Sequence, residues 1–149
     1  MVNKLILWSF CLIILSSCVV SPPKKTTNIC EIFYEKRSWY KAAVKTEKRW
    51  GSPAYVTLAF IKQESDFQQG AKPERTKLLG FIPWKRKSSA YGYAQAIDGT
   101  WDIYKKQAKK PLASRTSFKD SVDFIGWYNK KSNKPVSYTH LTLPTTCTV

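Results

Sequence analysis

Residues 52–67 read SPAYVTLAFIKQESDF, and this segment predicts a helix. Ser52 is a preferred residue for a helix N-cap, and Pro53 suits the first helical position. An apolar run follows and ends at Ile61. Glu64 comes three residues after Ile61, so its side chain should emerge from the side of the helix that packs into the core. We therefore expect a helix that carries a carboxyl close to its buried face.

A partly buried carboxyl at Glu64 would have a chemical use. Desolvation disfavours the charged form of a carboxyl and raises its pKa. A carboxyl of that kind holds a proton near neutral pH and can donate it to a leaving oxygen, which is the role of a general acid. The alternative is an ordinary solvated helix glutamate without such a role.

A second motif lies one loop further along the chain. Residues 89–96 read SAYGYAQA, and they follow the ESDF of residues 64–67. Together the two motifs resemble the leading motifs of the soluble lytic transglycosylase family, a Glu-Ser on a helix and then a Gly-Leu-Met-Gln-like segment. Tyr93 and Ala94 stand where that family usually has Leu-Met. The resemblance points to the glycan of the bacterial cell wall.

The coarse pattern of the chain is mainly α, with α+β as the alternative. Asn28 predicts the cap of a first helix whose apolar side continues to Val44. Asp98 predicts the cap of another helix, and Ser117 with an acidic residue three positions on resembles a capping box. Residues 69–89 are rich in Gly and Pro and predict a loop or a short hairpin. The family resemblance implies a lysozyme-like domain with a cleft.

The resemblance also implies residue roles. Glu64 would protonate the glycosidic oxygen between N-acetylmuramic acid and N-acetylglucosamine. It would then deprotonate the sugar's own 6-hydroxyl, which closes a 1,6-anhydro ring. The sequence offers no second carboxylate near it, whereas ordinary glycosidases use two. The substrate-binding residues implied are Ser65, Tyr91, Gly92, Tyr93 and Gln95. Tyr91 and Tyr93 have the alternative of being plain core aromatics, and no metal or cofactor is implied.

The amino terminus predicts export. An apolar run at residues 5–15 has the length of a signal-peptide core, and the LSSC that ends at Cys18 resembles a bacterial lipobox. We therefore expect residues 1–17 to be a lipoprotein signal peptide and residues 18–28 a tether lipidated at Cys18. This implies a lipoprotein of the bacterial cell envelope, at the outer membrane and facing the periplasm. A short transmembrane anchor is the alternative.

The charge of the chain favours polyanionic partners. Lys and Arg number 25 against 10 Asp and Glu, which gives a formal net charge of +15. Nucleic acid is one such partner, and the basic residues 85–87 beside aromatics would suit it. An exported lipoprotein rarely meets DNA, so we do not expect nucleic acid as a partner. We expect the protein to be a monomer whose partners are peptidoglycan strands and, through the lipid anchor, the membrane. A lysozyme-like hydrolase and an inactive wall-binding lipoprotein are the alternatives to a transglycosylase.

The carboxy-terminal segment differs in composition from the rest. Residues 135–149 contain no Lys, Arg, Asp or Glu, so we expect a C-terminally incomplete domain over residues 29–134 and a non-native tail after it. A natural Thr-rich tail is the alternative. The family has a third motif of the Tyr-Asn-Ala-Gly kind, which we expect beyond the break. The only similar string is WYN, at residues 127–129, and we expect Trp127 and Tyr128 to pack the last helix.

Overall fold

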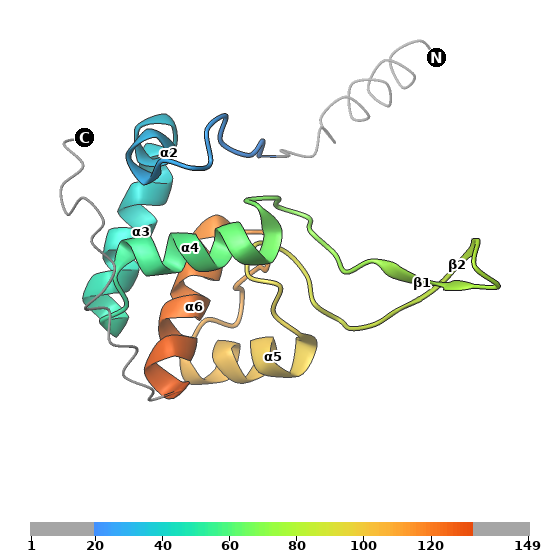
Figure 1. The fold of residues 1–149 in the computed structure, drawn as a ribbon. Coiled ribbons are helices and arrows are strands. Elements are labelled where there is room, and N and C mark those ends of the chain that lie inside the picture. Colours follow the sequence, from blue (N-terminus) through green and yellow to red (C-terminus); the bar gives the residue numbers. More distant parts are fainter. Residues whose placement is uncertain (1–19, 133–149) are drawn as a thin grey trace, which may run out of the picture.

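The computed structural model describes residues 20–132 and shows a mainly helical domain with one small hairpin (Figure 1). The predicted fold class is confirmed. In chain order the elements are α2 (Ile29–Glu35), α3 (Arg37–Trp50), α4 (Ala54–Ser65), β1 (Arg75–Leu78), β2 (Ile82–Arg86), α5 (Asp98–Gln107) and α6 (Phe118–Ser132). No helix within residues 20–132 is long and apolar enough to cross a membrane. The predicted signal peptide, the lipidation of Cys18 and the predicted tail lie outside the described residues.

The first predicted helix is two helices. Asn28 caps α2 as expected, because its side-chain oxygen accepts hydrogen bonds from the backbone N–H groups of Cys30 and Glu31. The chain then leaves the helical conformation at Lys36, where φ is −119° and ψ is 68°, and α3 begins at the next residue. The expectation of one continuous helix to Val44 is therefore wrong. The break gives the short α2 its own direction, and Phe33 packs edge-on against Tyr40 across it.

Helix α4 begins and ends differently from the sequence expectation. Pro53 occupies the N-cap position and has no side chain that can cap the helix, while the Glu47 carboxylate accepts a hydrogen bond of 3.3 Å from the first N–H of the helix, at Ala54. Ser52 is buried, and its hydroxyl accepts a hydrogen bond of 3.1 Å from the side-chain amide of Asn129. The predicted Ser52 cap is wrong because that hydroxyl serves a tertiary contact. The helix ends where Asp66 and Phe67 adopt left-handed conformations, with φ of 48° and 61°.

The two later helices also show how far capping patterns hold. Ile97, and not Asp98, is the N-cap of α5, and Asp98 lies in the first turn. For α6 the serine half of the predicted capping box is present, because the hydroxyl of Ser117 accepts a hydrogen bond of 3.4 Å from the N–H of Asp120. The reciprocal half is not, because the Asp120 carboxylate accepts from the N–H of Ser114 instead. Asp98 instead forms an ion pair of 2.7 Å with Arg115, which precedes α6. A residue expected to start a helix thus connects two segments.

The core is built on the crossing of α3 and α6, with an aromatic cluster at one end. Trp39 of α3 stacks on Phe118 of α6 with ring centres 3.8 Å apart. Gly126 permits the close approach of the two helices, because a β-carbon there would lie 2.6 Å from a methyl group of Thr46 and 2.9 Å from the Trp50 ring. A larger residue at position 126 would force the side chains of Thr46 and Trp50 to shift.

The segment predicted as a loop or short hairpin forms an antiparallel hairpin. The pairs Arg75 with Arg86 and Leu78 with Ile82 set the register of β1 and β2, and the register is irregular between Arg75 and Lys77. The hairpin projects away from the helices (Figure 1). It leaves the end of α4 and returns to the segment that precedes α5, so it emerges between the two sequence motifs.

Candidate active site

A cavity of about 250 Å³ brings the two sequence motifs together. Its walls come from three parts of the chain: the last turns of α4, the segment before and at the start of α5, and the second half of α6. The lining residues are Phe60, Glu64, Ala94, Gln95, Ala96, Ile97, Thr100, Phe124, Ile125, Tyr128 and Asn129. Glu64 and Gln95 face the same cavity, as the motif pair led us to expect.

Glu64 lies one residue before the end of α4 and is exposed. The expectation of a partly buried carboxyl is therefore wrong for the protein without a bound ligand. Glu64 and Phe60 share one side of α4, as their spacing predicts, but that side faces the open cavity and not the core. Glu64 is the only Asp or Glu that lines this cavity within the described part of the chain.

The second motif forms a tight turn that is held by Arg115. Gly92 has a φ of 78°, and a β-carbon there would come within 2.0 Å of the Arg115 carbonyl oxygen. That same oxygen accepts a hydrogen bond of 3.2 Å from the N–H of Tyr93. The Arg115 guanidinium donates to the carbonyl oxygens of Ser89 and Ala96 at 3.1 and 2.9 Å. Both ends of the turn are thus tied to one residue.

Gln95 sits at the end of this turn in a left-handed conformation, with a φ of 45°. Its amide nitrogen donates to the carbonyl oxygens of Ala71 and Gly92 at 2.9 and 2.8 Å. Two acceptors therefore fix the orientation of the amide. The side-chain oxygen has no partner among the described residues, and it is the group that this residue can offer to a ligand.

Several residues implied as substrate-binding do not line the cavity. Ser65 is buried, and its hydroxyl donates to the carbonyl oxygen of Ile61, one turn earlier in α4. Tyr93 is 1% exposed and packs edge-on against Trp39 and Phe118. Burial raises the pKa of the Tyr93 hydroxyl to about 12. Direct contact of Ser65 or Tyr93 with a glycan is therefore corrected to a packing role, because the side chains of both lie inside the domain.

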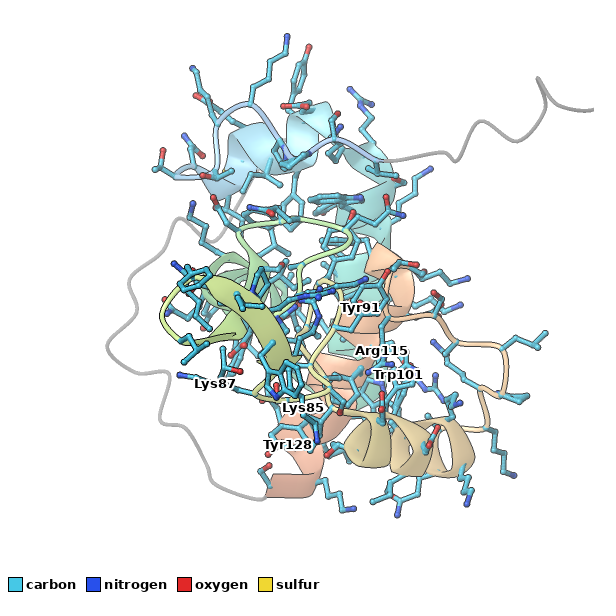
Figure 2. All side chains as sticks on the ribbon, turned by 90° about the vertical axis from the view of Figure 1, so that its right-hand side faces the viewer. Lys85, Lys87, Tyr91, Trp101, Arg115 and Tyr128 are labelled. Carbon is cyan, nitrogen blue, oxygen red and sulfur yellow. The ribbon has the colours of Figure 1, made fainter. Side chains whose placement is uncertain are left out.

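Gly92 and Tyr91, which were also implied as substrate-binding residues, have different surroundings. Gly92 is buried and serves the turn. Tyr91 is partly exposed, and the cationic groups of Lys72 and Arg115 lie over its ring at 5.0 and 5.5 Å. Figure 2 shows Tyr91 beside Arg115, on the side from which the hairpin projects. Tyr91 does not line the cavity, and its described contacts are with these two cationic side chains.

Helix α6 contributes residues to the cavity that were not predicted as site residues. Trp127 is buried, as expected, but Tyr128 is 47% exposed and lines the cavity together with Asn129. Tyr128 stacks on Phe124 of the same helix at 5.9 Å, as expected, but the expectation did not include the exposed side of its ring, which faces the cavity. The signal was present, because WYN resembles the start of the family's third motif. The small residues that usually follow in that motif are missing here, which makes the resemblance incomplete.

A comparison with known protein families matches the transglycosylase SLT domain over residues 6–140, which is most of the chain. The chain belongs to this family. No curated protein and no solved structure matches. Glu64 lies near the end of α4, within the Glu-Ser motif for which the family resemblance implied a catalytic residue.

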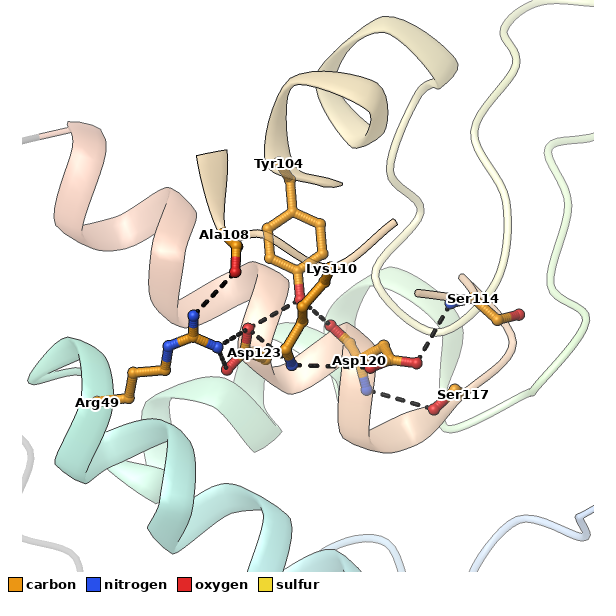
Figure 3. Close-up of polar contacts among 8 residues, drawn as sticks. All are labelled: Arg49, Tyr104, Ala108, Lys110, Ser114, Ser117, Asp120 and Asp123. Atoms are coloured by element: carbon orange, nitrogen blue, oxygen red, sulfur yellow. Dashed lines mark hydrogen bonds and ion pairs between the residues drawn. The ribbon is translucent and has the colours of Figure 1, made fainter. Parts of the chain in front are cut away.

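The SLT domain has a second polar centre, around Asp123 of α6, and none of its residues lines the cavity (Figure 3). Asp123 is 4% exposed, accepts a hydrogen bond of 2.8 Å from Tyr104, and pairs with Lys110 at 3.0 Å and with Arg49 at 3.3 Å. Burial acts to raise the pKa of Asp123, but hydrogen bonds from Lys110 and Tyr104 outweigh it and hold the pKa below its usual value. Burial, followed by the charge of Asp123, raises the pKa of Tyr104. This centre ties α3, α5 and α6 together.

Among the described residues, the polar side chains of the cavity are one carboxyl, two amides and the hydroxyls of Thr100 and Tyr128. No group of three or more His, Cys, Asp or Glu side chains that could hold a metal ion occurs within residues 20–132. Glu64 can exchange a proton, while Gln95 and Asn129 can orient a polar ligand. Phe60, Ile97 and Tyr128 add exposed apolar surface at the rim.

Proposed function

We propose that this SLT domain is a lytic transglycosylase. It cleaves the β-1,4 bond between N-acetylmuramic acid and N-acetylglucosamine in peptidoglycan and forms 1,6-anhydro-N-acetylmuramic acid. The observation that carries the proposal is the single carboxylate, Glu64, in a cavity that also holds two amide side chains. A glycosidase that activates water needs a second carboxylate, which this cavity does not contain among the described residues.

Glu64 serves as acid and then as base in the proposed reaction. Its protonated carboxyl donates to the glycosidic oxygen, and the bond from that oxygen to the anomeric carbon of the muramic residue breaks. The acetamide of the same sugar stabilises the resulting cation. The Glu64 carboxylate then takes the proton of the 6-hydroxyl while the 6-oxygen bonds to the anomeric carbon. No water is consumed, and Glu64 ends protonated, as it began.

The exposure of Glu64 fits a site that its substrate completes. A glycan strand seated in the cavity would cover the carboxyl and exclude water from it, which protects the cationic intermediate from hydrolysis. The exposed side chains of Phe60 and Tyr128 offer apolar surface to sugar ring faces. The amide oxygen of Gln95 can accept hydrogen bonds from sugar hydroxyl or acetamide N–H groups.

The location in the cell is part of the same proposal and depends on the sequence alone. Residues 1–17 would be removed as a signal peptide, and Cys18 would carry lipid. The remaining chain would act as a monomeric lipoprotein on peptidoglycan strands in the periplasm, attached to the outer membrane. The excess of basic residues suits a wall polymer that carries peptide carboxylates.

Product analysis tests the proposed reaction. The protein is incubated with purified peptidoglycan, and the soluble products are examined by mass spectrometry before and after borohydride treatment. We expect products lighter by one water than reducing muropeptides and unchanged by borohydride. Reducible ends would identify a hydrolase instead. Binding to peptidoglycan without any product would identify an inactive wall-binding protein.

A further inference from the structure

The β1–β2 hairpin contributes no residue to the cavity, and its sequence is divided by charge. Residues 75–87 read RTKLLGFIPWKRK. The seven residues 78–84 carry no charge, and a basic segment stands on each side of them. Because β1 and β2 pair as a hairpin, the uncharged residues form the outer end and the basic residues lie nearer to the helices. The hairpin therefore has an apolar end and a cationic base.

The apolar end is exposed. Leu79 is 76%, Phe81 74% and Trp84 61% exposed, and Ile82 is exposed as well. In Figure 1 the hairpin stands clear of the helices, so the domain itself does not cover these side chains. An isolated two-stranded hairpin is only marginally stable in water, and clustered exposed apolar side chains mark interaction sites. A partner that accepts apolar side chains is therefore expected here.

The cationic base has the features of an anion site. A hollow of about 550 Å³ runs along β2, and it is lined by Arg75, Trp84, residues 85–87 and two serines. No acidic side chain lines it. Figure 2 looks at the molecule from the side of the hairpin and shows Lys85 and Lys87 on it. Phosphate groups suit such a hollow, since both Lys and Arg bind them.

We propose that the hairpin docks on an anionic phospholipid surface. The side chains of Leu79, Phe81 and Ile82 enter the acyl region, and the basic residues contact the headgroup phosphates. Trp84 stands between the apolar and basic parts, at the depth that tryptophan prefers in membranes. Anionic lipids attract basic segments close to the membrane surface, which supplies the second part of the interaction.

The composition of the hairpin favours lipid over the other polyanions. Within residues 75–87 the only uncharged polar side chain is Thr76, and its hydroxyl already donates to the Lys85 carbonyl oxygen at 2.7 Å. A sugar ring could stack on Trp84 or Phe81, but the segment has no amide or carboxylate that would accept hydrogen bonds from sugar hydroxyls. Leu79 and Ile82 offer no flat face on which a sugar ring or a nucleobase could stack. A fluid hydrocarbon layer accepts aliphatic and aromatic side chains alike.

The test uses a signal local to Trp84, because the full chain also carries the apolar run at residues 5–15, which can bind vesicles. The full chain and its Trp84→Phe variant are mixed with phosphatidylglycerol vesicles whose acyl chains carry bromine. The difference in fluorescence quenching between the two proteins belongs to Trp84. We expect Trp84 to be quenched by these vesicles and much less by brominated phosphatidylcholine vesicles, and we expect salt to reduce the quenching.

Two charge-reversal variants complete the experiment. The first changes Lys77, Lys85 and Lys87 to Glu, which are exposed and have no side-chain ion pair in the described structure. The second makes the same changes at three exposed lysines of α3 and α5, namely Lys41, Lys48 and Lys106. Each lysine near an anionic membrane surface contributes about fivefold to the affinity for lipid. The first variant loses three, so it should need at least roughly a hundredfold more lipid for the same Trp84 quenching. The second should stay close to the unmodified chain.

The proposal does not rest on the proposed catalysis, and its failure has a clear form. An absence of Trp84 quenching with phosphatidylglycerol would overturn it, as would equal behaviour of the two charge-reversal variants. Cosedimentation with lipid-free peptidoglycan separates the remaining explanation. If the hairpin variant alone loses that cosedimentation while Trp84 is not quenched by lipid, the hairpin binds wall polymer instead.

Discussion

Gly92 and Arg115 approach so closely that no side chain fits between them. A β-carbon at position 92 would lie 2.0 Å from the Arg115 carbonyl oxygen and 2.6 Å from its carbonyl carbon. Gly92 also has a φ of 78°, which L side chains rarely adopt. The turn that presents Gln95 to the cavity therefore depends on a glycine at this position, for space and for conformation.

Replacement of Gly92 by alanine should destabilise the domain and disturb the site. We expect a loss of about 2–4 kcal/mol in the free energy of unfolding, since the clash is with backbone and adds to the unfavourable φ. Urea unfolding measures this loss. Gly99→Ala is the matched control, because a β-carbon there meets nothing within 4 Å. Gly99 lies in α5, so its replacement should be neutral or slightly stabilising. Equal losses in the two variants would contradict the role of the Arg115 contact.

Replacement of Glu64 by glutamine should abolish glycan cleavage and leave the fold unchanged. The amide has nearly the shape of the carboxyl but cannot donate and recover a proton. We expect a loss of at least about 10²–10⁴-fold in the rate of release of soluble products from peptidoglycan. Glu74→Gln is the control, since Glu74 is exposed and does not line the cavity. Retention of more than a few per cent of the activity by the Glu64 variant would contradict the assignment.

Tyr128 should matter for binding of the glycan strand. Its ring is half exposed on the wall of the cavity, so a bound sugar can cover it. We expect Tyr128→Ala to weaken binding by about 1–2 kcal/mol, or roughly 5- to 30-fold, because the apolar area covered is lost. The measurement is cosedimentation of an inactive Glu64→Gln background with peptidoglycan. Tyr34→Ala removes a more exposed ring, 71% against 47%, that lies away from the cavity, and it should leave binding unchanged.

Asp123 should make the stability of the domain depend on pH in the acid range. Its pKa is lowered in the folded protein, so the unfolded chain takes up the proton first as the pH falls. The stabilisation is complete above the unfolded value of about 3.9 and is lost as the pH falls through the lower folded value. We expect Asp123→Asn to lower the free energy of unfolding by about 2–4 kcal/mol at neutral pH. Its stability should also fall less steeply than that of the unmodified chain between about pH 4 and pH 2.

Asp102→Asn controls for a general effect of removing a carboxylate. Asp102 is exposed and pairs with Lys105 on the surface of α5 at 2.9 Å, where solvent screens the pair. We therefore expect its unfolding curve to follow that of the unmodified chain across the pH range. A variant of Asp123 that does the same would show that the network in Figure 3 does not stabilise the fold.

Local sequence patterns predicted the helices better than their ends. The side chain of Asn28 caps α2 because its partners, the next N–H groups, are local. Ser52 and Asp98 have the right residue type for a cap, but distant residues engage them: Asn129 in one case and Arg115 in the other. No pattern along the chain announces such contacts. The break at Lys36 was equally invisible, because a helical period continues on both sides of it.

For the site, the sequence provided the catalytic candidate but not its surroundings. Glu64 and Gln95 were found through the motif pair, and both line the cavity. The exposure of Glu64 was not predicted, because helical spacing gives the face of α4 but does not tell whether core or open cavity covers it. Ser65 and Tyr93 share the motif with the lining residues, yet both point inside. A motif thus combines residues that line a site with residues that support it.

The amide side chains of Gln95 and Asn129 offer a substrate the same kind of hydrogen-bonding atom, an acceptor oxygen. Gln95 uses its NH₂ group on two backbone carbonyl oxygens, and Asn129 uses its own on the Ser52 hydroxyl. The side-chain oxygens of both residues therefore remain as acceptors for a ligand that enters. The two amides thus favour ligands rich in O–H and N–H groups, while the hydroxyls of Thr100 and Tyr128 and the protonated Glu64 carboxyl can donate to a ligand's own oxygens. Glycan analogues with methylated hydroxyls or methylated acetamide nitrogens should then be excluded more strongly than their size alone would require.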